Sequence, residues 1–265
     1  MCCPSATLSV WSSAWLNGAA AADNALDALA AWGEAHEVVA ADAETADRLD
    51  LPVAGAVPVQ PAQLLGALRG IGAADARLAL PVPGDVRGLG GGGPFTEGAL
   101  HAGEAALFPS AGCAVVPQPI AEGLLRWTVY PVPVGTAPEF VGIGEAEHLL
   151  TDAVRVSAGT LQQLDVARDR PGVRGELKAR LRSAPKPGWP APMPGRCLLV
   201  LQRADEVEAI LALALSDEPG GALSASATAQ RSEALRPLSD AVRTARCAAV
   251  TEAVRVLSGD ADRQV

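Results

Sequence analysis

The sequence is poor in aromatic side chains, which make up 3% of its 265 residues, although hydrophobic residues as a whole make up 49%. Its core must therefore be built from alanine, leucine and valine rather than from rings. Lysine is equally scarce, because all of the 21 basic residues except Lys178 and Lys186 are arginine. An excess of alanine, glycine, proline and arginine is typical of a GC-rich genome and is weak evidence about function.

Long hydrophobic runs and secretion signals are also missing. The longest apolar run late in the chain covers residues 209–215, far short of the ~20 residues that a membrane span needs. The N-terminus has no basic segment ahead of an apolar one, which argues against a signal peptide. The five cysteines are scattered and show no C-x-x-C spacing. We therefore expect a soluble, cytoplasmic protein with reduced thiols.

Basic charge is missing from the first half of the chain. Residues 1–140 carry 14 acidic residues against 5 arginines, a net charge of -9, whereas residues 141–265 carry 16 acidic and 16 basic residues. An acidic surface repels nucleic acid and anionic membranes. We therefore expect no membrane partner and no nucleic acid partner, and only the second half could tolerate a large anionic partner.

The first 140 residues alternate short apolar runs with helical stretches. Strands are predicted at residues 7–11, 37–41, 77–82, 113–116 and 126–132. Helices are predicted at residues 23–32, with Asp23 as the N-cap, at 45–49, and at 60–68, where Pro61 suits the first turn. Strands separated by helices predict an α/β region, or a mixed α+β one, with a mixed or mainly parallel sheet. Pro81 indicates that its strand ends there or lies at a sheet edge.

After Pro138 the hydrophobic pattern changes to a helical period. Helices are predicted at residues 145–167, 173–181, 197–215 and 223–257, and Pro237 should kink or break the last of them. Residues 1–140 are thus predicted as an α/β region and residues 141–265 as a bundle-like helical region. The sequence leaves open whether these are separate domains or one continuous domain. The proline-rich segment 185–194 is interpreted as a stiff connector, the alternative being a polyproline ligand anchored by Trp189.

The strongest candidate for a ligand site is a glycine-rich loop. No serine lies in G-x-S-x-G and no G-x-x-x-x-G-K-[ST] is present. However, residues 88–96 follow a predicted strand and precede a helix that Thr96 would cap. Backbone N–H groups at such a place bind phosphate or carboxylate, unless the loop is a flexible surface loop without a ligand. The candidate ligand-binding residues are Asp85, Arg87, Gly90, Gly91, Gly92, Gly93 and Thr96.

Two carboxylate–histidine pairs have the spacing of metal ligands on a helix. His101 and Glu104 form the first pair, and Glu145 and His148 form the second, with Asp152 one turn later. The two pairs come from distant parts of the chain, so solvated helix faces are the simpler interpretation. We predict no metal site and no cofactor.

A basic cluster lies between residues 168 and 182. Within it, Arg174, Lys178 and Arg182 share one helical face at the spacing i, i+4, i+8. The cluster has no interleaved aromatic residues, which proteins that bind single strands use for stacking. It is interpreted as a solvated helix face, the alternative being a docking site for an acidic or phosphate-rich partner.

Three acidic residues interrupt the apolar helix predicted at residues 197–215. Asp205, Glu206 and Glu208 form either the polar stripe of that helix or ion pairs with arginines of neighbouring helices, such as Arg246. Both interpretations are structural rather than catalytic. His36 precedes a predicted strand and is interpreted as a loop residue.

Three runs resemble a known family. They are Leu-Ala-Leu-Pro-Val-Pro-Gly-Asp-Val-Arg-Gly-Leu at residues 78–89, Ala-Asp-Glu-Val-Glu-Ala-Ile-Leu at 204–211 and Asp-Glu-Pro-Gly-Gly-Ala-Leu-Ser at 217–224. They resemble an uncharacterised protein family of high-GC actinobacteria, and the resemblance spans most of the chain. It implies a bacterial cytoplasmic setting and brings no activity, cofactor or catalytic residue.

Two hypotheses about function follow. The first is a non-catalytic cytoplasmic interaction or regulatory protein with a protein partner, because the sequence contains no complete catalytic constellation. The alternative is a small-molecule binder or enzyme that acts on a small anionic ligand, phosphorylated or carboxylated, at the glycine-rich loop of residues 88–96.

Overall fold

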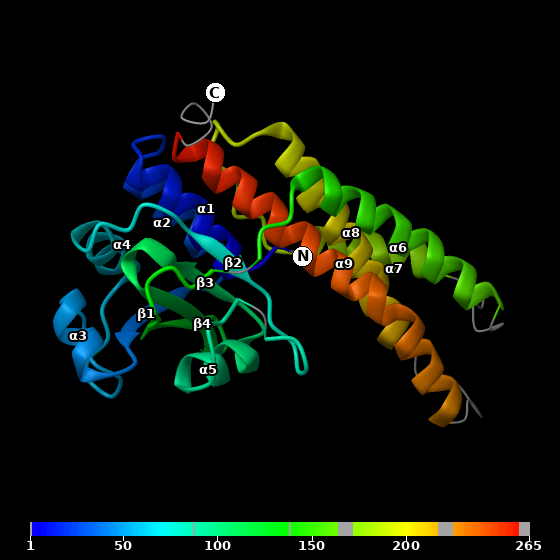
Figure 1. The fold of residues 1–265 in the computed structure, drawn as a ribbon, viewed down its shortest axis with the longest axis horizontal. Helices are drawn as coiled ribbons and strands as arrows, with labels where there is room; N and C mark the ends of the chain where they lie inside the picture. The colour runs from blue at the N-terminus through cyan, green and yellow to red at the C-terminus, as the bar shows by residue number, and fades with distance from the viewer. Residues whose placement is uncertain (1, 87, 138, 164–171, 217–224, 260–265) are drawn as a thin grey trace. The chain divides into compact units, whose positions relative to one another are not determined.

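The structure is a computed structural model in which residues 2–86, 88–137, 139–163, 172–216 and 225–259 are described (Figure 1). The chain divides into two compact units. The α/β unit comprises Cys3–Phe140 together with Pro185–Pro194 and the residues from Val250 onward, and the helical unit comprises chiefly Val141–Ala184 and Gly195–Ala249. The predicted mixed α/β class is confirmed, whereas a division into domains after residue 140 stays a prediction.

A five-stranded sheet forms the centre of the α/β unit, in the order β1-β5-β4-β3-β2. β1 (Ala35–Ala40) pairs in parallel with β5 (Leu124–Pro131). The strands β4 (Cys113–Ala121), β3 (Ala105–Phe108) and β2 (Arg77–Ala79) continue the sheet antiparallel. The sheet is therefore mixed, and the alternative of a mainly parallel sheet is wrong. β2 ends before Pro81 and lies at the sheet edge, as that proline indicated.

The first predicted strand is a helix instead. α1 (Pro4–Leu16) contacts β2, β3 and β4, and its residues 5–14 are all buried. Two of its hydroxyls donate to carbonyls of the preceding turn, Thr7 to Cys3 at 3.3 Å and Ser9 to Ser5 at 2.8 Å. Such bonds satisfy polar side chains within the helix itself. A run with a strand-like pattern can therefore form a buried helix.

Two side chains distant in the sequence make further polar contacts with α1. The N–H of Ser5 donates to the Glu104 carboxylate at 2.6 Å, across 99 residues of sequence. Glu104 lies in the turn between α5 (Pro94–Ala102) and β3. Trp32 donates through Nε1 to the Thr7 hydroxyl at 2.9 Å. Because the first N–H groups of a helix have no partner within it, the Glu104 carboxylate acts as the cap that the local sequence does not supply.

The proline-rich segment 185–194 is part of the α/β unit. Trp11 of α1 donates through Nε1 to the Gly188 carbonyl at 3.3 Å. Met193 is 5% exposed and Trp189 is partly buried. These contacts support the interpretation of the segment as a connector.

The remaining helices of the α/β unit pack along the sheet. They are α2 (Ala22–Ala30), α3 (Ala43–Leu49), α4 (Pro61–Gly70) and α5. α4 has Pro61 in its first turn, as predicted, whereas the N-cap of α2 is Ala21 and Asp23 lies within the first turn. α5 covers the sheet face that carries Leu107 and Val116. Alternate strand residues are also buried and belong to the opposite face, on which α1 lies.

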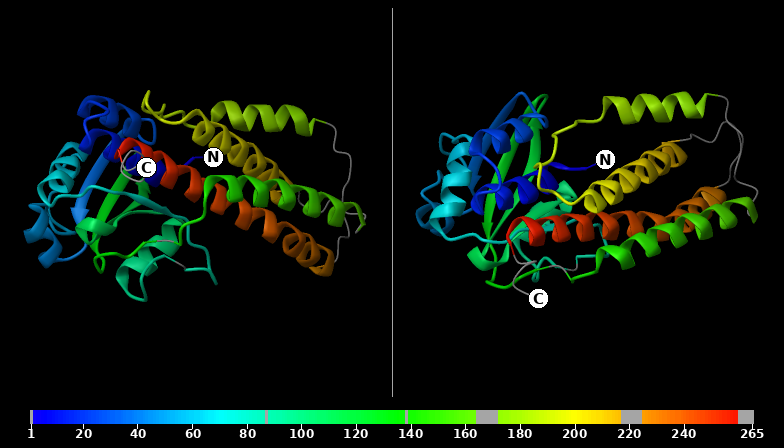
Figure 2. Two further views of the ribbon diagram at one scale, coloured as in Figure 1. Left: turned by 45° about the horizontal axis from the view of Figure 1, so that its top comes forward. Right: turned by 90° about the horizontal axis from the view of Figure 1, so that it is seen from above.

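Among the described residues, four helices form the helical unit: α6 (Ile143–Gln163), α7 (Val173–Ser183), α8 (Gly195–Ser216) and α9 (Ala225–Leu257), the last of which ends in the α/β unit. α8 contacts both α6 and α7, and α7 lies beside it in Figure 2. α9 continues through Pro237, so the predicted break of the helix is wrong, while the alternative of a kink stays a prediction. Pro237 is exposed, and water can therefore bond the carbonyl that lacks an N–H partner. Among the described helices, none is long and apolar enough to cross a membrane.

The Glu104 cap predicts that Glu104→Ala lowers the free energy of unfolding by about 1–2 kcal/mol, because the first turn of a buried helix loses its acceptor. Urea unfolding followed by far-UV circular dichroism measures the change. The matched control is Glu122→Ala, which removes an exposed carboxylate from the turn between β4 and β5. Equal losses in the two variants would show that Glu104 does not cap α1.

Candidate functional site

The glycine-rich loop is fixed to the core of the α/β unit at its start. Leu89 is 2% exposed and belongs to the same core cluster as Phe95. Gly90 has a φ of +77°, and a Cβ at this position would lie 2.7 Å from Cγ2 of Thr136. Both the left-handed backbone and the close approach of Thr136 require glycine here. Packing therefore explains the glycine at position 90.

The rest of the loop leads into α5. Gly93 is the N-cap, and Pro94 in the first turn provides no N–H for an anion. The sequence predicted that Thr96 caps this helix. This prediction is wrong, because Thr96 lies inside the first turn and Gly93 is the N-cap. Its hydroxyl donates to the Gly91 carbonyl. Gly91 and Gly92 are exposed, so their backbone remains accessible to a ligand.

The two charged candidates are Asp85 and Arg87. Asp85 exchanges backbone hydrogen bonds with Val82, at 2.8 and 3.1 Å. Arg87 lies outside the described residues. The structure brings Thr96 and Gly91 together, and ligand binding by the candidate set stays a prediction.

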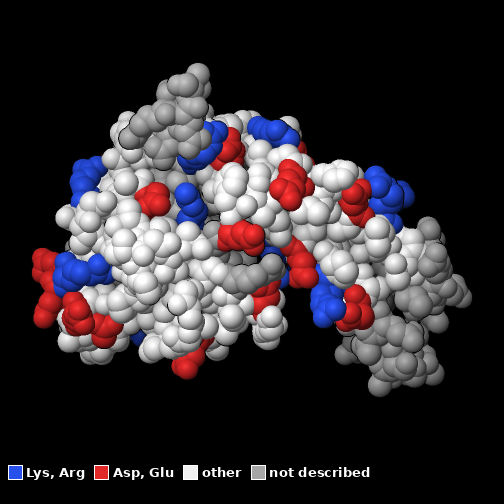
Figure 3. Space-filling model, in the orientation of Figure 1, with Lys and Arg blue, Asp and Glu red and all other residues white. Residues whose placement is uncertain are grey.

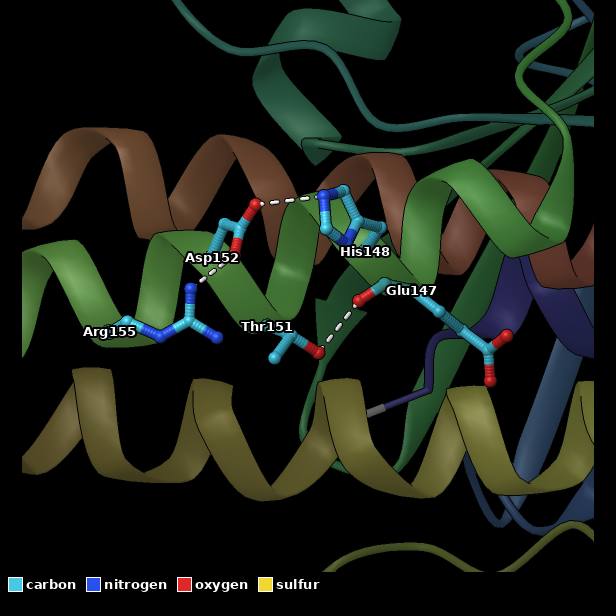
Figure 4. Close-up of polar contacts among 5 residues, drawn as sticks. All are labelled: Glu147, His148, Thr151, Asp152 and Arg155. Atoms are coloured by element: carbon cyan, nitrogen blue, oxygen red, sulfur yellow. Dashed lines mark hydrogen bonds and ion pairs between the residues drawn. The ribbon is translucent and has the colours of Figure 1, made fainter.

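In each of the two candidate groups of metal-ligand type, a carboxylate contacts a protein group instead. Glu104 caps α1 through Ser5, as described above. On α6, His148 Nε2 lies 3.0 Å from Asp152 Oδ2, and Arg155 donates to Oδ1 of the same carboxylate at 2.6 Å (Figure 4). Asp152 is thus already paired with a cation, which disfavours a metal ion there. Within the described ranges, no three His, Cys, Asp or Glu residues are grouped so that they could hold a metal ion.

A buried histidine–tryptophan pair is the polar site that the sequence did not reveal. His36 lies in β1 and is 8% exposed, so its interpretation as a loop residue is wrong. Trp127 of β5 donates through Nε1 to His36 Nδ1 at 3.0 Å, and His36 Nε2 lies 3.2 Å from the Gly33 carbonyl. Because Nδ1 accepts a hydrogen bond, the ring is neutral and carries its proton on Nε2. Burial lowers the pKa of His36 and outweighs the bond to Gly33, which raises it.

A buried ion-pair cluster joins α8 to α9 within the helical unit. The Arg246 side chain is 6% exposed and bonds to Asp205 at 2.6 Å and to Glu208. Burial opposes ionisation of both Arg246 and Glu208, yet their hydrogen bond and opposite charges raise the pKa of Arg246 and lower that of Glu208. The prediction that the acids of this helix pair with arginine is confirmed for Arg246, whereas Arg236 and Arg243 pair within α9.

Positive charge on α7 is not neutralised in this way. Arg174, Lys178, Arg180 and Arg182 are exposed, and within the described part of the chain none of them forms an ion pair. On the face of the molecule drawn in Figure 3, by contrast, many basic side chains stand beside acidic ones. Outside α7, all six arginines of the helical unit whose side chains are described form ion pairs: Arg155, Arg196, Arg203, Arg236, Arg243 and Arg246.

The helices α6 and α8 expose large apolar side chains. Leu149 and Val156 of α6 are 43% and 62% exposed and lie seven residues apart, which places them on one helix face. Leu199 and Ile210 of α8 are 66% and 49% exposed and also share a face, since eleven residues make about three turns. Leu198 and Leu215 of α8 are exposed as well. The helical unit thus offers apolar surface on two helices that contact each other.

Two family models match the chain. One is described as Rv1486c-like protein, N-terminal domain, and matches residues 5–141. The other is described as Rv1486c-like protein, C-terminal domain, and matches residues 144–247. The chain therefore belongs to the Rv1486c-like family, which confirms its resemblance to an actinobacterial family.

Mycobacterial proteins are similar to this chain along almost their whole length. Rv1486c of Mycobacterium tuberculosis is 37% identical, with 95% of this chain and 97% of that protein covered. ML1804 of Mycobacterium leprae is 34% identical, with 94% and 97% covered, and MAV321 of Mycobacterium avium is 34% identical, with 98% and 100% covered. No solved structure matches the chain. Each relative is named as an uncharacterized protein, so function is argued from the residues of this chain.

The neutral His36 predicts that the protein loses stability in mild acid. A histidine whose pKa is lower in the folded state stabilises the fold above its unfolded pKa of about 6.5, and this contribution is lost as the pH falls through the folded value. The free energy of unfolding should fall by up to about 1 kcal/mol between about pH 7.5 and 5.5.

Urea titrations of the wild type and His36→Asn measure this effect. The asparagine amide oxygen can take the place of Nδ1 and accept from Trp127 without titrating. The variant should therefore lose less stability than the wild type over the same pH range, and parallel pH profiles would contradict the assignment.

The ion-pair cluster predicts a large effect of Arg246→Met at neutral pH. The change removes the buried cation to which Asp205 and Glu208 bond, which should cost about 2–3 kcal/mol. The cost stays below that of a fully buried pair because the two carboxylate side chains are 27% and 42% exposed. Thermal unfolding measures it. The control Arg236→Met removes an arginine that is 68% exposed and should change stability by less than about 0.5 kcal/mol; similar losses would refute the cluster's importance.

Proposed function

We propose that this protein is a non-catalytic interaction protein of the cytoplasm whose helical unit binds a protein partner. The observation that carries the proposal is that α6 exposes Leu149 and Val156 and α8 exposes Leu199 and Ile210, with exposed fractions of 43–66%. Single exposed apolar residues are ordinary on protein surfaces. A set of them on two contacting helices is typical of a surface that binds another protein.

The expected energy of such an interface is sufficient for specific binding. Covering a half-exposed leucine, isoleucine or valine contributes about 1 kcal/mol. Four such side chains at the centre of an interface would supply a good part of the binding energy, with polar neighbours at the rim.

The cysteines support a cytoplasmic setting. All five carry thiols rather than disulfides. Burial raises the pKa of the Cys113 thiol to about 12, although the nearby charge of Arg48 lowers it. A thiol that stays protonated is a poor nucleophile, so Cys113 acts in packing, which is consistent with a non-catalytic role.

A small anionic ligand at residues 88–96 is the alternative, and it has less support. In its favour, Gly91 and Gly92 are exposed next to the start of a helix. Against it, Pro94 removes a donor from that helix start, and the Thr96 hydroxyl already bonds to Gly91.

The proposal predicts that a double variant, Leu199→Ser with Ile210→Ser, loses its partner. Tagged protein would be incubated with extract of a bacterium that carries a family member, and captured proteins would be quantified by mass spectrometry. The amount of partner protein captured by the variant should be lower than that captured by the wild type by a factor of about ten or more, because the variant lacks central apolar contacts. Sedimentation of the purified chain tests the case in which the partner is a second copy.

The matched control is Val57→Ser with Ile120→Ser, which changes apolar residues that are 86% and 40% exposed in the α/β unit. Equal capture by the wild type and both variants would refute the proposal. A thermal-shift screen with phosphate-bearing and carboxylate ligands tests the alternative, since a bound ligand at about 100 times its Kd stabilises by about 2.7 kcal/mol. A hit that disappears in Gly91→Pro would favour the anion site.

A further inference from the structure

The helix α7 differs in charge and burial from the rest of the protein. It carries four cations and one carboxylate, a net charge of +3, while the whole chain has a net charge of -9. None of its residues is fully buried. α7 contacts α8. The residues of α7 that are partly buried form one stripe along the helix: Val173, Leu177 and Leu181.

Three of the cations form one edge of α7, directly beside this stripe. Arg174, Lys178 and Arg182 follow the three apolar residues by one position at each turn. Residues four apart lie above one another on a helix face. The three charges therefore form a row about 12 Å long, because each residue adds about 1.5 Å to the helix.

These cations are available for binding because no described carboxylate competes for them. The arginines elsewhere in the helical unit bind carboxylates of the same chain, as shown above. A partner would have to break those ion pairs, whereas Arg174, Lys178 and Arg182 form none with the described residues. Guanidinium groups also bind carboxylates through two hydrogen bonds at once.

We propose that the row Arg174, Lys178 and Arg182 docks an acidic helical segment of a protein partner, with carboxylates at a four-residue spacing that matches the cations. The inference rests on the proposed function and names the chemistry of the partner. Charges of opposite sign at this spacing align the segment along the row, and they speed its association.

Extended anionic surfaces fit the row less well than a single helix. The row is one helix edge wide, so it matches the width of a single helix. A membrane or a nucleic acid duplex presents its phosphates over a much wider surface, most of which would receive no cation from α7. The net charge of the whole chain, -9, also disfavours a large anionic partner. α7 also contains no aromatic residue on which single-stranded bases would stack.

The test is fluorescence anisotropy with a fluorescein-labelled, alanine-based peptide of about 20 residues that carries glutamate at every fourth position. We expect the wild-type protein to bind it, and the affinity to fall as NaCl is raised from about 50 to 300 mM. The same peptide with glutamine in place of glutamate should not bind. The variant Arg174→Gln, Lys178→Gln, Arg182→Gln should bind at least about tenfold more weakly.

The matched control is Arg155→Gln, Arg203→Gln, Arg236→Gln, which removes the same charge from exposed arginines that are already paired. It should change the affinity by less than about twofold, and circular dichroism checks that both variants fold. Equal weakening in the two variants, or no binding of the glutamate peptide, would overturn the inference. So would tighter binding to phosphatidylglycerol vesicles or to a single-stranded oligonucleotide.

The two proposals fail in distinguishable ways. If the α8 double variant captures as much partner as the wild type, the apolar surface of the proposed function is refuted. If binding of the glutamate peptide does not depend on the α7 cations, the chemistry assigned to the partner is refuted whether or not a partner is captured.

Discussion

The α/β unit depends on the burial of α1, whose residues 5–14 are all inaccessible. A helix buried in this way must find partners for its polar groups without water. The hydroxyls of Thr7, Ser9 and Ser12 bond back along the helix, whereas those of Ser5 and Ser13 are buried without a partner among the described residues. Glu104 accepts the N–H of Ser5, and Trp32 donates to Thr7. The turn before β3 and the end of α2 are thereby tied to one element. The position of α1 sets the positions of its neighbours.

Three of the few aromatic residues join separate elements through a hydrogen bond as well as filling space in the core. Trp11 bonds to the proline-rich segment, Trp32 to α1, and Trp127 to His36 of the adjacent strand. Tryptophan combines a large apolar surface with one N–H donor. In a core built mainly from alanine, leucine and valine, such side chains fix how separate elements meet.

The sequence predicted the elements whose signals are local. The strands at residues 37–41, 113–116 and 126–132 are apolar runs, and α4 begins at a proline suited to its first turn. α1 was predicted as a strand because its capping carboxylate lies 99 residues away. β3 was missed because Ala105–Phe108 is short and follows no alternating pattern. Pro237 did not end α9, since an exposed position lets water satisfy the affected carbonyl.

The candidate binding sites were also predicted only where their signal is local in the sequence. The spacing of Arg174, Lys178 and Arg182 is visible in the sequence, but the pairing of the other arginines is a property of the folded unit. The partnership of His36 and Trp127, 91 residues apart, leaves no local pattern. The glycine-rich loop was recognised as a motif, while the packing of Gly90 against Thr136 depends on the folded chain.

The α/β unit is discontinuous in the sequence, and this affects how the protein is made. Val250–Leu257 at the end of α9 belong to that unit, and Pro185–Pro194 do as well. A ribosome adds about 5–20 residues per second, so the first 140 residues must wait on the order of 10 s for the last part of their own unit. During that time the buried face of a nascent sheet and helix remains incomplete. The synthesis of Val250–Leu257, rather than the completion of the first half, is the point at which this unit can close.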